Sequence, residues 1–63
     1  SFYPNPARST IHFEKEVVDV KLMDLEGKVV LTAENTKHIN IGNLANGVYI
    51  IKMENTFQKL IIQ

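Results

Sequence analysis

Apolar and polar residues alternate at period two through most of this 63-residue chain, and that alternation limits its possible folds more than any other feature. Successive side chains of a β-strand point to opposite faces, so such a pattern places one apolar row toward a core. In "VVDVKLMD" it predicts that Val18, Val20 and Leu22 face the core, while Asp19 and Lys21 face solvent. Because no stretch has the 3.6-residue period of a helix, the sequence predicts an all-β fold.

Turn-forming residues divide this pattern into hairpins. The segment "DLEG", residues 24–27, suits a type I turn with Gly27 in a left-handed conformation, which returns the chain antiparallel through "KVVLTA". A second hairpin is expected from "VYIIKME" and "FQKLIIQ", with its turn at Asn55-Thr56. Its strands are the most apolar in the chain, and we expect them to be buried on both faces.

Two further segments, "STIHF" and "KHINI", complete the predicted strands, the second with Ile39 and Ile41 on one face. Between "KHINI" and the last hairpin, "GNLANG" predicts a reversal with Leu44 plugging the core. The lead-in Tyr3-Pro4-Asn5-Pro6 is stiff and unsuited to helix or central-strand pairing, though it could pair at a sheet edge. We therefore predict a small antiparallel β-sandwich of six to seven short strands.

The length and the charge of the chain limit the classes of function that are possible. A chain this short forms one domain, residues 1–63, whose core supplies only about 3–5 kcal/mol. Seven basic residues balance seven acidic ones without clustering, which disfavours nucleic-acid binding. No apolar run approaches the roughly 20 residues of a membrane-spanning helix, so we expect no membrane insertion. The chain has no cysteine, which excludes disulfides and thiolate zinc sites.

Candidate catalytic groups are few. Ser9 and His12 are three apart, and on a strand an odd separation places them on opposite faces, so they form no nucleophile–base pair. His12 and His38 could share a metal ion, but no third ligand stands at a recognisable spacing, and exposed histidines are the better interpretation. We predict no catalytic residues, no metal site and no cofactor.

Binding sites for calcium, phosphate or sugar are equally weak. The possible calcium ligands Asp24, Glu26 and Asn55 lack the dense D-x-D-x-D-G pattern and suit turns instead. No helix follows the glycines to hold a phosphate. A carbohydrate platform remains a minority alternative, and it would use the five aromatic residues Phe2, Tyr3, Phe13, Tyr49 and Phe57.

Three motifs in order, "YPNPA", "DLEGKVV" and "INIGNLANGVYIIKM" followed by "QKLIIQ", resemble the C-terminal sorting domain of the type IX, or Por, secretion system of Bacteroidetes. The resemblance covers essentially the whole chain. The family tail is often rich in lysine, whereas here only Lys59 stands in the last five residues. The pattern carries over to Tyr3, Pro4, Asn5 and Pro6, to Asp24, Gly27 and Lys28, and to Leu44, Gly47, Val48 and Tyr49.

This resemblance implies an immunoglobulin-like sandwich that acts as a non-catalytic address tag on a larger secreted protein. The cargo would lie N-terminal to the tag, pass through the periplasm, and end at the cell surface or outside the cell. The implied partners are translocon and shuttle components and a surface sortase that removes the tag.

The terminal strand is the predicted recognition element. An edge strand offers unpaired backbone groups, so we expect reading by strand addition, or by a groove that takes Leu60 and Ile62. The predicted recognition residues are Lys59, Leu60, Ile61, Ile62 and Gln63. Two alternatives remain open: the strand could be only a structural member, and the domain could be a β-sandwich accessory module that binds carbohydrate or another surface partner.

Overall fold

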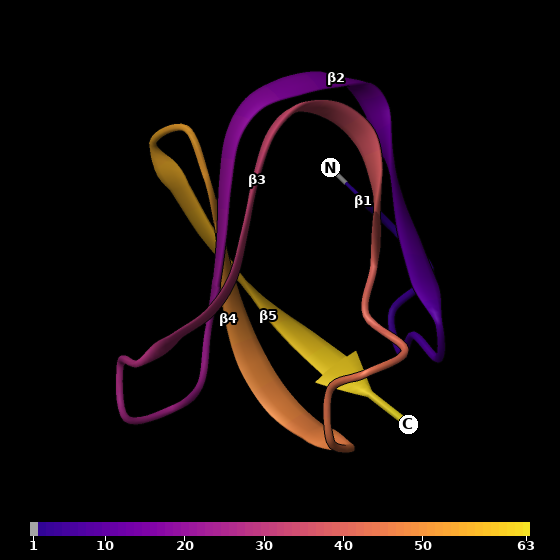
Figure 1. Ribbon diagram of the computed structural model, residues 1–63, viewed down its shortest axis with the longest axis vertical. Coiled ribbons are helices and arrows are strands. Elements are labelled where there is room, and N and C mark those ends of the chain that lie inside the picture. Colours follow the sequence, from indigo (N-terminus) through magenta and orange to yellow (C-terminus); the bar gives the residue numbers. More distant parts are fainter. Residues whose placement is uncertain (1) are drawn as a thin grey trace.

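A computed structural model of the chain describes residues 2–63, which form one antiparallel sheet (Figure 1). Its strands are β1 (Phe2–Tyr3), β2 (Thr10–Met23), β3 (Val29–Asn40), β4 (Gly47–Met53) and β5 (Thr56–Ile62). The hydrogen-bonded order is β1-β2-β4-β5, and β3 pairs with β2. The predicted all-β antiparallel class is thus confirmed.

The long hairpin of β2 and β3 arches over the molecule, and the hairpin of β4 and β5 crosses beneath it (Figure 1). One end of β2 pairs with β1, through Phe2 opposite Phe13. The other end pairs with β4, through Leu22 opposite Ile51. Because one bent strand serves both parts, the sheet curls around its own apolar face.

The described residues form five strands rather than the predicted six to seven. Most of "STIHF" and "VVDVKLMD" lies in β2, which leaves out Ser9 and Asp24. Most of "KVVLTA" and "KHINI" lies in β3, which leaves out Lys28 and Ile41. Charged residues at the bend interrupt the apolar–polar alternation of β2 and β3, so the sequence predicts two short strands in place of each long one. Within the bend, Asn35 of β3 adopts a left-handed conformation with φ of 51°, which asparagine tolerates better than most residues. Of the lead-in, only Tyr3 pairs in an edge strand, as the second residue of β1.

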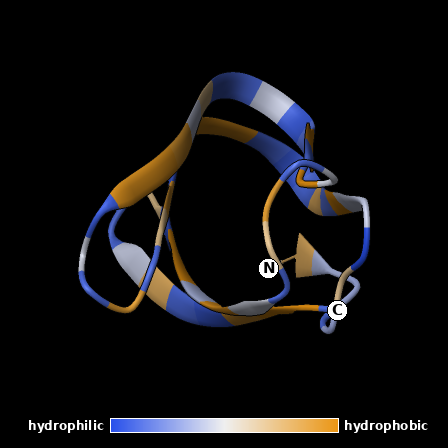
Figure 2. Ribbon diagram, turned by 60° about the horizontal axis from the view of Figure 1, so that its bottom comes forward, coloured by the Kyte–Doolittle hydropathy of each residue, from blue (hydrophilic) through white to orange (hydrophobic). Residues whose placement is uncertain are grey.

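The core lies inside the curled sheet, and Figure 2 shows hydrophobic and hydrophilic residues alternating along its strands. Val20 and Leu22 are fully buried, as predicted, but Val18 is 58% exposed and Val17 is buried in its place. The alternation changes phase between Val17 and Val20, at the bend opposite Asn35. The buried hydrophobic residues are Ala7, Ile11, Phe13, Val17, Val20, Leu22, Ile39, Ile41, Tyr49, Ile51, Met53, Leu60 and Ile62.

The last hairpin is not buried on both faces. Every second residue of β4, such as Tyr49 and Ile51, faces the core, whereas Val48 is 39% exposed on the other face. On β5, Phe57 is 63% exposed. Its turn is Glu54-Asn55, one residue earlier than predicted. The sheet curls around its inner face, and no further element formed by residues 2–63 covers this outward face.

Candidate functional site

The proline-rich lead-in lies along the terminal strand. The side-chain amide of Asn5 donates from Nδ2 to the carbonyl oxygen of Lys59, and its Oδ1 accepts from the N–H of Ile61, both at 3.0 Å. One side chain thereby replaces a peptide unit of a neighbouring strand. The flanking prolines hold the backbone of this segment, and both X–Pro peptide bonds are cis.

Ala7 extends this contact with the terminal strand through its backbone groups. Its N–H donates to the carbonyl oxygen of Ile61 at 2.7 Å, and its own carbonyl accepts from the N–H of Gln63 at 2.8 Å. The side chain of Ala7 is fully buried against the core. We call the hydrogen bonds of Asn5 and Ala7 to residues 59–63 the clasp.

The clasp reduces the number of free backbone hydrogen-bonding groups at the edge of the terminal strand. We expected an open edge here, but the outward backbone groups of Lys59, Ile61 and Gln63 named above are already paired. A groove that takes Leu60 and Ile62 is also excluded in the folded domain, because these side chains are only 0% and 2% exposed. Both face inward because they continue the core row of β5.

The central motif forms the turn between β2 and β3. The N–H of Gly27 donates to the carbonyl oxygen of Asp24 at 3.0 Å, and Gly27 has a φ of 90°, as the sequence predicts. The carboxylate Oδ1 of Asp24 accepts from the N–H groups of Glu26 and Lys28, both at 2.9 Å. This carboxylate is therefore occupied in shaping the turn.

The late motif anchors the loop between β3 and β4. Leu44 is half-buried and packs against the core, in keeping with its predicted role. Tyr49 is 8% exposed, and its hydroxyl donates to the carbonyl oxygen of Ala45 at 2.6 Å. The structure thus gives the first and late motifs direct contacts that hold the fold.

A row of exposed rings crosses three strands on another part of the surface. Tyr3 lies opposite His12, and His12 lies opposite His38. The rings of Tyr3 and His12 stack with centroids 5.5 Å apart, and the two imidazoles lie 6.4 Å apart. The sequence predicts that both histidines are exposed but not that they are neighbours, since their pairing depends on the register of β2 and β3.

No group of three or more His, Cys, Asp or Glu side chains that could hold a metal ion occurs within residues 2–63. An open depression of about 480 Å³ lies between the bend of β2 and the β4–β5 turn, with Glu14, Glu16 and Glu54 among its lining residues. Ser9 lies outside β2, and both Ser9 and His12 are exposed. Within residues 2–63 as a whole, no helix is long and apolar enough to cross a membrane.

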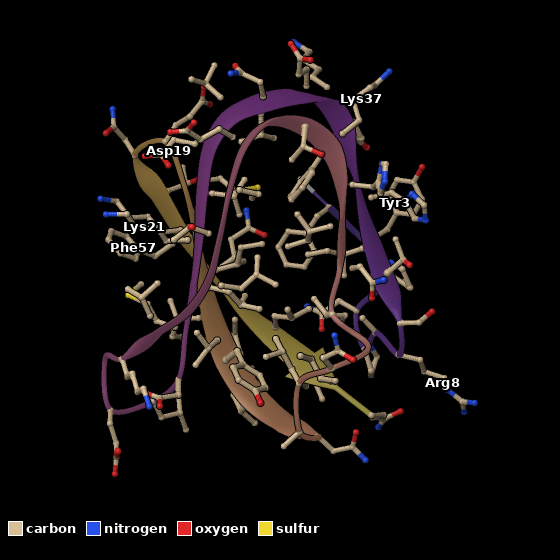
Figure 3. All side chains as sticks on the ribbon, in the orientation of Figure 1. Tyr3, Arg8, Asp19, Lys21, Lys37 and Phe57 are labelled. Atoms are coloured by element: carbon tan, nitrogen blue, oxygen red, sulfur yellow. The ribbon has the colours of Figure 1, made fainter. Side chains whose placement is uncertain are left out.

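The exposed aromatic residues do not form one platform. Tyr3 and Phe57, the most exposed of them, project from opposite sides of the molecule (Figure 3). Phe13 and Tyr49 are buried in the core, and Phe2 is half-buried against it. This arrangement does not favour the carbohydrate alternative.

Comparison with known proteins gives one family. Neither the curated proteins nor the solved structures contain a significant match. Among protein families, the one described as secretion system C-terminal sorting domain matches residues 1–63, which is the whole sequence. The three sequence motifs that resemble this family form the clasp, the β2–β3 turn and the Tyr49 loop. The chain therefore belongs to the C-terminal sorting domains of the type IX secretion system.

Proposed function

We propose that residues 1–63 form a single non-catalytic signal that directs a cargo protein, attached N-terminally, through the type IX secretion system and across the outer membrane. The observation that carries this proposal is the family match over the whole sequence. The clasp supports it, because Asn5 and Ala7 join the first motif to the last strand and make the ordered motifs one folded unit.

The proposed partners follow from the family. They are the translocon and shuttle components of the type IX system, and a surface sortase that removes the domain. The cargo passes through the periplasm and ends at the cell surface or outside the cell. We also propose that the curled sheet is this chain's version of the immunoglobulin-like sandwich, with the bent strands β2 and β3 each contributing to both layers.

The recognition segment Lys59–Gln63 remains a proposal in a narrower form. Leu60 and Ile62 face the core, so direct reading of the folded strand uses its outward side chains. Those are Lys59 and Gln63, which are exposed, and Ile61, which is half-buried.

A reporter experiment tests the proposal. A fluorescent protein with its own N-terminal signal is fused in front of residues 1–63 and expressed in a host with a working type IX system. We expect the reporter at the cell surface or in the medium, and in the periplasm of an isogenic strain without the translocon. A matched fusion with the domain placed before the reporter should not be exported. Retention of the first fusion in the periplasm of the competent host would overturn the proposal.

A further inference from the structure

The face of the sheet turned away from the core carries an unusual set of side chains. Directly paired residues of antiparallel strands point to the same face, as do residues two apart on one strand. The register therefore places one apolar group on the outward face of β2, β3, β4 and β5, which we call the outer face. This group is Met23, Val29, Val48, Ile50, Phe57 and Ile61.

Three lysines stand among these apolar side chains. Lys21 lies directly opposite Lys52, which lies opposite Phe57, and Lys59 lies opposite Ile50. Figure 3 shows Lys21 and Phe57 projecting from the same side of the molecule. The carboxylates Asp19 and Glu34, which pair with each other across β2 and β3, lie at one end of this face. Although the chain has no net charge, the middle of the outer face is positive.

This arrangement costs the isolated domain stability. Like charges directly opposite each other on a sheet are destabilising, which applies to Lys21 and Lys52. The ammonium group of Lys52 lies 5.7 Å from the ring centroid of Phe57, which offsets part of this cost by a cation–π contact. Phe57 is 63% exposed and Val29 is 44% exposed, so apolar area is also left in water. A bound partner would relieve both costs.

We propose that the outer face is a docking surface for a protein of the export machinery that presents acidic side chains around an apolar centre. This inference rests on the proposed function, and it names the chemistry of the partner. Carboxylates of the partner would pair with Lys21, Lys52 and Lys59, and its apolar centre would cover Ile50 and Phe57. A standard interface takes about 800 Å² from each partner, roughly a fifth of the 4228 Å² that this chain exposes, so one sheet face suffices.

Charge and shape select this occupant over two others. A second copy of the chain that docked by the middle of this face would bring three lysines against three lysines, and this repulsion opposes that form of self-association. A lipid surface holds amphipathic elements by insertion of their apolar side chains into the boundary region. On the outer face Phe57 is the only apolar member of the group above that is more than half exposed, while Ile50 and Met23 are half-buried. Such a shallow face suits a flat protein surface.

Charge reversal in the reporter fusion tests the proposal. The triple variant Lys21→Glu, Lys52→Glu and Lys59→Glu should lower the surface fraction of the reporter about tenfold or more, because like charges across an interface oppose binding. The matched control is Arg8→Glu, Lys15→Glu and Lys37→Glu, which makes the same change in net charge at exposed positions outside the outer face. This control should be exported like the original fusion.

A second variant separates docking from folding. Phe57→Gln removes the most exposed apolar side chain of the outer face, and it should reduce export severalfold without loss of structure. Far-ultraviolet circular dichroism and thermal unfolding of each purified variant identify those that remain folded, and only these are compared. If the lysine variant is unfolded, Lys21→Gln with Lys59→Gln takes its place, with Lys15→Gln and Lys37→Gln as its control.

The outcomes are distinct. Normal export of folded outer-face variants, with loss of export on deletion of residues 1–63, overturns the docking surface and leaves the sorting function standing. Failure of the unmodified fusion overturns both. Binding of the purified chain to phosphatidylglycerol vesicles but not phosphatidylcholine vesicles, abolished by the lysine variant, would assign the face to a membrane and overturn the protein partner. Concentration-dependent dimers in sedimentation that the lysine variant changes would assign it to self-association.

Discussion

The side-chain oxygen of Asn5 accepts a hydrogen bond from the backbone N–H of Ile61, a residue 56 positions later, at 3.0 Å. The same amide donates to the carbonyl of Lys59, so it spans the buried Leu60 between them. An asparagine between two prolines thus serves as a strand partner where proline, with no N–H, could not. This explains how a segment unsuited to a sheet can protect a sheet edge.

The clasp should contribute measurably to stability. We expect Asn5→Ala to lower the free energy of unfolding by about 1–2 kcal/mol, because it removes two hydrogen bonds to an edge strand. Asn5→Asp should not rescue, since a carboxylate faces the carbonyl of Lys59 where the amide donated. Urea unfolding followed by circular dichroism measures both. The exposed loop variant Asn43→Ala should change the value by less than about 0.5 kcal/mol, and an equal loss there would contradict the role of Asn5.

The turn at Gly27 should be sensitive to conformation rather than to space. A Cβ at this position meets nothing within 4 Å, but the φ of 90° is one that most side chains avoid. We expect Gly27→Ala to cost about 1–2 kcal/mol and Gly27→Asn clearly less, because asparagine enters the left-handed region more readily. The midpoint of thermal unfolding reports the difference. Equal midpoints for the two variants would show that the conformation of Gly27 is not what limits substitution.

Neighbouring residues of the terminal strand should behave very differently. Leu60 is fully buried, and Leu60→Ala should cost about 2–5 kcal/mol, which is comparable with the whole stability of a core this small. Circular dichroism at 25 °C should therefore show a largely unfolded chain. Ile61→Ala, on the outer face, should cost less than about 1.5 kcal/mol and leave the chain folded. Similar losses for both would contradict the inward orientation of Leu60.

The hydroxyl of Tyr49 should stabilise the loop before β4. We expect Tyr49→Phe to cost about 1 kcal/mol, because it removes the 2.6 Å hydrogen bond to the carbonyl of Ala45 and keeps the ring in the core. Urea unfolding measures the change. Tyr3→Phe is the matched control, since Tyr3 is 54% exposed and should lose less than about 0.5 kcal/mol. If both variants were equally stable, the Tyr49 hydroxyl would have no structural role.

Local chemistry was predictable from the sequence, and long-range pairing was not. The turn at Gly27 and the core position of Leu22 follow from rules that act over two to four residues. Val18 was placed on the wrong face because the bend opposite Asn35 changes the phase of the alternation, and no residue in "EVVDV" marks that change. The clasp and the His12–His38 pair depend on register between distant segments, which composition and periodicity do not fix.

The sequence shows the order of the family motifs along the chain, and the structure shows which of them are in contact. "YPNPA" and "QKLIIQ" are 54 to 56 residues apart where Asn5 meets Lys59 and Ile61. Neither motif carries a charge pair or a cysteine that would point to the other. The outer face could not be predicted from the sequence either. Only the register of β2, β4 and β5 brings Lys21, Lys52 and Lys59 to one surface.

The clasp also sets an order in time. A ribosome makes Asn5 before it makes residues 59–63, so their hydrogen bonds form only after nearly all of the domain has been synthesised. A product that stops before Lys59 leaves the amide of Asn5 without both of its partners, and Ala7 without its own. A closed domain is therefore a physical sign that translation has passed through everything that precedes its last strand.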